Sequence, residues 1–444
     1  MSPRPLVIWI VAILLGLAWW SLRGDRPEPA GSQVLLLQDR LPVERIDEIE
    51  IAFRDGTRTL IRRTGDQWRQ LQPFPVGIDA FSARQLITTA AALRGLRALE
   101  APGQSDLGTE DLGLAVPNAT ITWRWDAGST TLDLGDRTLA GGAWASLKGT
   151  GEVWLVDAAL HERLFDLDHR LWRDRALLPE AGIETRGIGL RAGEERLILE
   201  RTPRGWTMKA PVETRADPVA IEEWLARLSR TRALGYLYDQ PSELGRYGLE
   251  PPIATIELVG RLDEDRAVLR LGDPLGVGST DRYGLLEGSP TVLRLGEDVQ
   301  GILVPSTASL VDPTGTAAIR EDVARLEIRR PGDSPDFTLE RDLDGWKLVL
   351  EDGTSRGVDR GAVERLLGQL TEARATEIAF GPYPAELERA VVVLHGFDGR
   401  PLDTVRVIRE GGEGRWALEN GDAVLRIHPA GFAPLLELDR LPPS

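Results

Sequence analysis

The sequence contains no cysteine among its 444 residues. This absence excludes disulfides, thiolate nucleophiles and cysteine-ligated zinc or iron–sulfur sites. Lysine is scarce as well, and only Lys148, Lys209 and Lys347 occur. None of the three follows a glycine, so the Gly-x4-Gly-Lys-Ser/Thr loop that cradles nucleotide phosphates is missing. We therefore predict no nucleotide and no cofactor.

Negative charge dominates the chain. The net charge is −16 at pH 7 and the pI is near 4.9. Such a surface repels phosphate backbones, so nucleic acid is not expected as a partner. The hydrophobic share of 42% is ample for packed cores, and the length suggests about three domains of about 150 residues each.

One apolar run, near the amino-terminal end, predicts a membrane anchor. Pro5–Leu22 just reaches the roughly 17 apolar residues that a bilayer span needs, and Trp19 and Trp20 near its end suit the headgroup boundary. We predict a transmembrane helix at residues 1–23 that meets the membrane through residues 6–22. The bulk of the chain is then expected on the periplasmic side of a bacterial inner membrane, as a single-pass protein.

A cleaved signal peptide is the alternative for this segment, because the run is short enough for its apolar part. No small-x-small cleavage site follows closely, since Trp19 and Trp20 intervene and Glu28 spoils the best candidate near Ala30. A retained anchor is the favoured prediction, followed by a linker over residues 24–42.

Tryptophans mark an internal repeat. Trp68, Trp206 and Trp346 lie 138 and 140 residues apart, and each follows an arginine by five positions with a glycine between them. This spacing predicts a hairpin whose second strand begins at the tryptophan. Packing of the hairpin against a helix is the favoured role of these tryptophans, and ligand stacking is the alternative.

A helix follows each of these hairpins in the predicted repeat. Asp79, Asp217 and Asp359 lie 11, 11 and 13 residues after the tryptophans and suit the N-cap position. Apolar residues then recur at i, i+3, i+4 and i+7, which places them on one helical face. The stripes are Ala83, Leu86, Ile87 and Ala90; Ile221, Trp224, Leu225 and Leu228; and Val363, Leu366, Leu367 and Leu370.

After each helix the apolar period returns to two, which predicts about four further strands with mainly antiparallel pairing. We therefore predict an α+β fold: an N-terminal transmembrane helix, then three tandem, mainly antiparallel β modules with one major amphipathic helix each. The predicted modules cover residues 43–180, 181–318 and 319–444, and the third is the most diverged.

Two short motifs carry a resemblance to a known family. The first motif, between a predicted helix and the strand at residues 254–258, is Tyr247-Gly248-Leu249-Glu250-Pro251-Pro252. The second, at the end of the following strand, is Leu271-Gly272-Asp273. The first module keeps Asp111-Leu112-Gly113-Leu114 and Leu134-Gly135-Asp136, and Arg173 to Leu178 closes it, whereas the third lacks the Gly-Leu-x-Pro element. The chain resembles the bacterial domain of unknown function 4340 (DUF4340) family over residues 43–440.

Members of that family are often encoded beside components of ABC transporters of the gliding-motility type. The resemblance implies an accessory protein of the envelope, and the family offers no established catalytic residues to carry over.

Candidate reactive groups are few and scattered. His161, Glu162, Asp166, Asp168, His169 and Asp174 form the one metal-like cluster, but their spacing fits no tetrahedral or EF-hand template. His395 and His428 are isolated, and Asp263-Glu264-Asp265 suits a solvated turn better than an acid–base pair. We therefore predict no catalytic, cofactor-binding or metal-binding residues.

Three functions remain open on these grounds. The favoured one is a non-enzymatic, membrane-anchored accessory or scaffold subunit of an ABC-type transport system, with a permease or envelope proteins as partners. The second is an envelope glycan or polymer binder, which would need tryptophans such as Trp123, Trp125 or Trp144 to line an exposed strip. An unrecognised hydrolase ranks last, because it needs a cleft with convergent polar groups.

Overall fold

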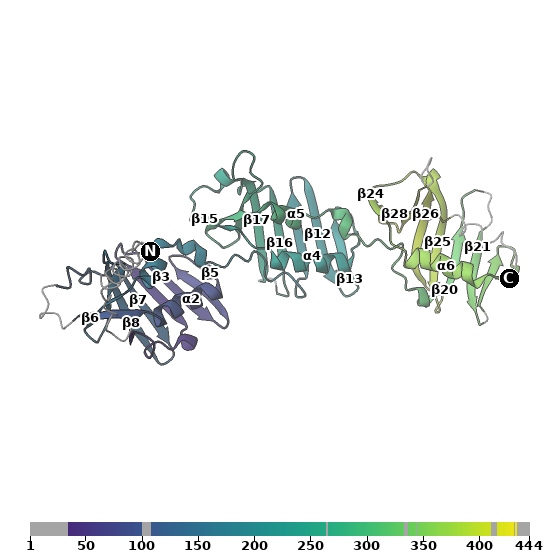
Figure 1. Ribbon diagram of the computed structural model, residues 1–444. Coiled ribbons are helices and arrows are strands. Elements are labelled where there is room, and N and C mark those ends of the chain that lie inside the picture. Colours follow the sequence, from purple (N-terminus) through teal and green to yellow (C-terminus); the bar gives the residue numbers. More distant parts are fainter. Residues whose placement is uncertain are drawn as a thin grey trace, which may run out of the picture. The chain divides into compact units, whose positions relative to one another are not determined.

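The computed structural model describes residues 34–99, 108–262, 265–332, 336–343, 345–409, 415–429 and 431–432. Its strands form three sheets, of ten, nine and nine strands, in which every pairing is antiparallel (Figure 1). The chain divides into two compact units between Asp174 and Arg175. The first unit holds the ten-stranded sheet, and the second holds both nine-stranded sheets.

The three sheets share one topology. The first has the order β1-β6-β10-β9-β8-β7-β2-β3-β4-β5, the second β14-β13-β12-β11-β16-β17-β18-β19-β15, and the third β23-β22-β21-β20-β25-β26-β27-β28-β24. Each is built from two four-stranded meanders whose first strands pair at the centre. In each sheet the strand before the helix and the strand after it lie at or next to opposite edges. The helix that connects them therefore runs across one face of the sheet.

The described elements have the following bounds. In the first unit they are β1 Val34–Leu35, β2 Glu48–Phe53, β3 Arg58–Thr64, β4 Gln67–Gln72, β5 Val76–Ile78, α2 Ala80–Ala91, β6 Arg94–Leu99, β7 Ala119–Trp125, β8 Gly128–Arg137, β9 Gly142–Leu147, β10 Glu152–Asp157 and α3 Ala159–His161. The second sheet and its helices are β11 Gly187–Ala192, β12 Glu195–Thr202, β13 Gly205–Ala210, β14 Thr214–Arg215, α4 Pro218–Arg230, β15 Gly235–Asp239, β16 Ala254–Val259, β17 Arg266–Pro274, β18 Arg282–Leu286, β19 Thr291–Leu295 and α5 Glu297–Leu303. The third comprises β20 Val323–Arg329, β21 Phe337–Asp342, β22 Gly345–Leu350, β23 Ser355–Val358, α6 Arg360–Thr371, β24 Glu377–Phe380, β25 Glu388–Gly396, β26 Pro401–Arg409, β27 Trp416–Glu419 and β28 Val424–His428. Short 3-10 or π turns are η1 Val43–Arg45, η2 Glu162–Asp166, η3 His169–Trp172, η4 Leu244–Tyr247, η5 Thr307–Leu310, η6 Arg320–Asp322 and η7 Ala385–Leu387.

The helix predictions are confirmed. Asp79, Asp217 and Asp359 each accept hydrogen bonds from backbone N–H groups in the first turn of α2, α4 and α6. Every residue of the three predicted stripes is buried. These stripes pack on the inward side chains of the sheets and give each sheet its own hydrophobic core.

The recurring tryptophans are structural. Each lies directly opposite its arginine on the neighbouring strand, and the guanidinium carbon lies 5.6, 4.8 and 5.1 Å from the ring centroid in the three sheets. Trp206 donates to Glu222 of α4 at 3.3 Å, and Trp346 donates to Glu364 of α6 at 3.2 Å. The spacing of five therefore reflects a cross-strand cation–π pair that ties hairpin to helix. This confirms the packing role over ligand stacking.

The predicted fold class is wrong. Of the described residues 46% lie in strands and 19% in helices, so the protein is mostly β rather than α+β. The sequence pattern missed the strands that flank each helix, because these strands have only two to six residues and some of them, such as β14 and β24, show little alternation. Across the described ranges no helix is long and apolar enough to cross a membrane. The segment predicted as anchor, residues 1–23, and most of the linker lie outside those ranges.

Candidate functional site

A short strap, residues 310–316, joins the second sheet to the third within the second unit. On one side Asp217 donates its backbone N–H to Leu310, and Asp312 donates to Arg215 of β14. On the other side Ala375 donates to Pro313, and Thr314 forms a bridge with Arg374 just before β24. The strap therefore pairs like a strand with the edges of both sheets.

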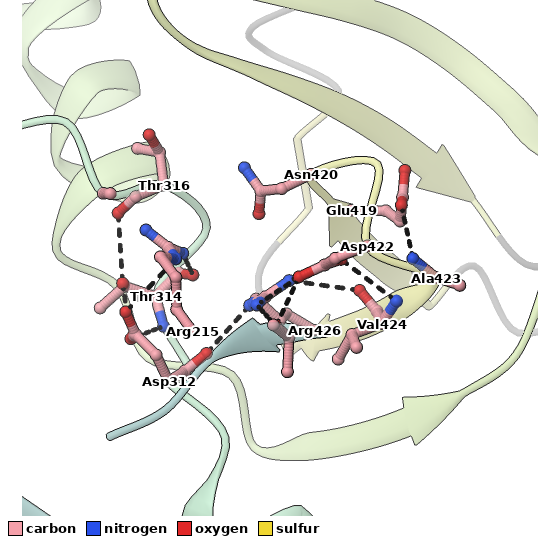
Figure 2. Close-up of polar contacts among 12 residues, drawn as sticks. Arg215, Asp312, Thr314, Thr316, Glu419, Asn420, Asp422, Ala423, Val424 and Arg426 are labelled. Atoms are coloured by element: carbon pink, nitrogen blue, oxygen red, sulfur yellow. Dashed lines mark hydrogen bonds and ion pairs between the residues drawn. The ribbon is translucent and has the colours of Figure 1, made fainter. Parts of the chain in front are cut away.

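Arg426 of β28 lies at the centre of this joint and is fully buried. Its Nε donates to the backbone oxygen of Asp312 at 2.9 Å, and Nη2 donates to the Thr214 hydroxyl at 3.0 Å and to Asp422 Oδ2 at 2.9 Å (Figure 2). Nη1 donates to Asp422 Oδ1 at 3.4 Å and to the oxygen of Val424 at 3.3 Å. All five guanidinium N–H groups are thus used.

Acceptors at the joint are equally committed. The Thr214 hydroxyl donates to Asp422 Oδ2 at 2.6 Å while it accepts from Arg426. Asp312 accepts from the backbone and hydroxyl of Thr314 at 2.9 and 2.7 Å, and its other oxygen lies 3.6 Å from Arg215 Nε. Arg426, Asp422 and Thr214 therefore satisfy one another, which specifies how these elements meet, while Nη1 of Arg215 is buried without a hydrogen-bond partner among the described residues.

A second contact reaches the start of α4. Arg374, from the third sheet's segment after α6, donates to the buried carboxylate of Asp217. The other oxygen of that carboxylate caps the helix through Val219 N at 3.0 Å. A residue of the third sheet thereby completes the cap of a helix on the second.

Buried groups at the joint have shifted pKa values. Burial pushes the pKa of Asp422 upward, but the hydrogen bonds and charge of Arg426, helped by Thr214, outweigh it and leave that pKa below its usual range. Burial lowers the pKa of His428 to about 4, and the charge of Arg426 adds to the effect. His428 is therefore neutral at pH 7.

Acid is expected to begin destabilising the second unit near pH 6.5, above the range in which carboxylates titrate. An unfolded histidine titrates near 6.5, so stability is full above that pH and falls as the pH drops toward 4, the pKa of folded His428. After a discount for residual solvent screening, the loss is about 2 kcal/mol between pH 7.5 and 4.5. Urea unfolding at both pH values measures it, and His428→Gln, which stays neutral, is expected to flatten the dependence. An unchanged slope in that variant would contradict the assignment to His428.

A groove of about 900 Å³ lies beside the joint. The β13 strand, the strap and the end of α6 contribute its walls. It is lined by four basic and four acidic side chains: Arg204, Lys209, Arg215 and Arg320, and Glu213, Asp312, Glu321 and Glu372. Burial lowers the pKa of Arg215, and the charge of Asp312 opposes the shift. The groove therefore has no single sign of charge.

The metal-like cluster of the first unit serves packing. His161 is buried and donates from Nε2 to the oxygen of Gly135 at 2.9 Å, since a carbonyl can only accept. His169 stacks on Trp172 with ring centroids 4.2 Å apart. Asp166 pairs with Arg137 at 2.8 Å, and Asp168 caps η3. Wherever the chain is described, no three His, Asp or Glu side chains form a group that could hold a metal ion.

Residues of the other predicted motifs are dispersed. His395 lies 3.5 Å from Glu327 on the third sheet. Asp263 and Glu264 fall outside the described ranges, and Asp265 hydrogen-bonds Gly260 within a turn. Trp123 is fully buried, and Trp125 and Trp144 are half-buried rather than aligned on an exposed strip. The joint, by contrast, contains no residue that the sequence singled out except His428 and the helix cap Asp217.

The two motifs of the family resemblance lock together. Gly248 has φ +62°, and a Cβ there would lie 2.4 Å from the Asp273 carboxyl carbon. A Cβ on Gly272 would lie 2.2 Å from the backbone oxygen of Tyr247. In the first unit the same approach occurs, since a Cβ on Gly135 would lie 2.2 Å from the oxygen of Leu112. The motifs are therefore a packing device that requires glycine on both sides.

Comparison with known proteins agrees with these motifs. The family model described as "Domain of unknown function (DUF4340)" matches residues 83–241 and, overlapping them, residues 206–390. The matches cover more than half of the chain. They include both copies of the glycine lock, which is the close contact of Gly272 with Tyr247 and of Gly135 with Leu112. A search of curated proteins found no match to this chain. On the strength of the family match, the chain belongs to the DUF4340 family.

Proposed function

We propose that the protein is a non-enzymatic accessory or scaffold subunit of an ABC-type transport assembly in the bacterial envelope. The observation that carries the proposal is the joint around Arg426, where the buried charged groups hydrogen-bond to residues of the joint itself. A reacting site needs polar groups that are held ready for a substrate. A network of satisfied groups instead serves to hold two sheets in one arrangement, which suits a scaffold.

The groove beside the joint supports a protein partner. It takes its walls from both sheets, so its shape depends on the joint that holds them. Its mixture of acidic and basic side chains suits a complementary protein surface, where charge pattern sets register and partner choice. We propose that a permease or another envelope protein of the assembly docks here.

Mild crosslinking in the native cell, followed by purification and mass spectrometry, tests this function. The wild-type protein is expected to recover a permease or a partner envelope protein. Arg204→Glu, which reverses an exposed charge of the groove, is expected to reduce that recovery several-fold. Arg389→Glu makes the same charge change on an exposed residue outside the groove and serves as the matched control. Recovery of the protein alone, or equal recovery with both variants, would sink the proposal.

The glycan-binding alternative has less support. Sugar stacking needs exposed aromatic faces, and the exposed large apolar residues of the described part include phenylalanine and tyrosine but no tryptophan. A glycan array that bound the wild-type chain through Phe81 or Phe397, which are 67% and 71% exposed, would revive it.

A further inference from the structure

The outer face of the second sheet has a trough floored by glycine. Positions 187, 189 and 191 of β11 face away from α4, and the first two of them are glycines. A Cβ at Gly187 or Gly189 would meet its nearest neighbour at 3.5 and 3.7 Å, which is ordinary contact, and neither φ is positive. The fold therefore does not require glycine here, although glycine weakens a strand.

The corresponding strands of the other sheets carry acids. On β2, Glu48 lies 2.7 Å from Arg62 and 2.6 Å from Arg124, and Glu50 lies 2.7 Å from Arg124. On β20, Glu327 pairs with Arg329 at 2.7 Å. The outer faces of the first and third sheets thus neutralise these arginines with neighbouring glutamates. The second sheet has a hollow of about 460 Å³ in the same place.

Two unneutralised arginines stand at one end of this hollow. Arg191 of β11 lies directly opposite Arg196 of β12, and both are exposed and line the hollow. Neither forms an ion pair with any residue in the described ranges. Like charges directly opposite each other on neighbouring strands are destabilising. The pair therefore costs stability in a chain whose net charge is −16.

The remaining walls offer acceptors for hydroxyl groups. Thr255 of β16 lies directly opposite Arg191 of β11. Glu200 lies opposite Gly187, Glu257 lies opposite Gly189, and both line the hollow. Glu257 is held by Arg266 at 2.6 Å. A hollow of this size falls in the range of small-molecule sites, about 300–1,000 Å³. Two adjacent arginines match the geometry of a phosphate group.

We propose that this trough binds a phosphorylated polyol or sugar. Arg191 and Arg196 hold the phosphate, the body of the ligand lies over Gly187 and Gly189, and Thr255 and Glu200 accept from its hydroxyls. The ligand is either a free sugar phosphate or a phospholipid headgroup with the same chemistry. Glycine keeps the floor low enough for the ligand to reach the arginine pair.

Calorimetric titration of the full chain with α-D-glucose 1-phosphate tests the soluble form of the ligand. One site is expected, with glucose and inorganic phosphate each binding at least tenfold more weakly because each lacks half of the contacts. Vesicles that contain phosphatidylglycerol, compared with vesicles of phosphatidylcholine alone, test the headgroup form. Binding in either arm supports the proposal and identifies the source. Absence of selective binding in both arms overturns it.

Variants separate the site from general charge effects. Arg191→Gln with Arg196→Gln is expected to weaken binding at least tenfold. Gly187→Ala with Gly189→Ala is expected to weaken it comparably while Tm stays equal or rises, since alanine fits without strain. Arg325→Gln with Arg329→Gln removes an equal charge from the outer face of the third sheet and is expected to leave binding unchanged. If the Arg191 and Arg196 double variant binds as wild type does, or the Arg325 and Arg329 double variant weakens binding equally, the assignment fails.

Discussion

Arg426→Met is expected to destabilise the second unit by about 3–5 kcal/mol, because it removes one partner of a buried ion pair. Asp422 would keep its place with a 13% exposed side chain and lose both bonds to the guanidinium. The backbone oxygens of Asp312 and Val424 and the Thr214 hydroxyl would each lose a donor as well. Urea unfolding, followed by far-UV circular dichroism, gives the free energy of unfolding.

The matched control is Arg400→Met on the same sheet. Arg400 has an 85% exposed side chain, and its contact with Asp398 at 3.6 Å lies in solvent. An exposed pair of this kind contributes about 0–1 kcal/mol. Arg426→Met combined with Asp422→Asn removes the stranded charge and should recover part of the loss. Equal losses for Arg426→Met and Arg400→Met would contradict the structural role of the joint.

Gly272→Ala is expected to destabilise the second unit by about 3 kcal/mol, the upper range for overpacking a close contact. Its Cβ would stand 2.2 Å from the backbone oxygen of Tyr247, and a backbone atom cannot move aside as a side-chain tip can. Gly135→Ala should cost the first unit a similar amount, because the same contact forms there with Leu112. Thermal and urea unfolding of each variant measure the effect.

Gly301→Ala is the control for this pair. Gly301 lies in α5, nothing stands within 4 Å of an added Cβ, and alanine favours helix over glycine by about 0.8–1 kcal/mol. This substitution is therefore expected to be neutral or stabilising. A Gly272→Ala protein as stable as the Gly301→Ala protein would show that the two motifs are not locked as the structure indicates.

Local features could be predicted from the sequence because each depends on residues near one another in the chain. The caps at Asp79, Asp217 and Asp359 and the apolar stripes follow from helix geometry. The arginine–tryptophan spacing of five follows from the register of a tight hairpin. Those signals placed three helices correctly, but they gave too much weight to helix and led to the wrong fold class.

Distant contacts left no such trace. Arg426 lies in an apolar run whose alternation predicts a strand, and nothing in it shows that the guanidinium is buried. Its partners Thr214 and Asp312 are 212 and 114 positions away. The glycine lock was visible only as a motif, since the contact between Gly272 and Tyr247 needs three dimensions to be seen. Gly187 and Gly189 likewise gain meaning only when the neighbouring strands are in place.

The crossing of each sheet by its helix has a consequence for biosynthesis. β15 pairs with β19, for example through Gly235 and Arg294. β15 therefore leaves the ribosome well before its partner strand has been synthesised. The same delay separates β24 from β28. Arg426 and Thr214 are 212 positions apart, so at translation rates of about 5–20 residues per second the joint waits on the order of 10–40 s for its central residue. The β14 edge is unpaired until the strap emerges, and the joint stays incomplete until β28 emerges, so nascent chains stalled before β28 should be the ones that recruit chaperones.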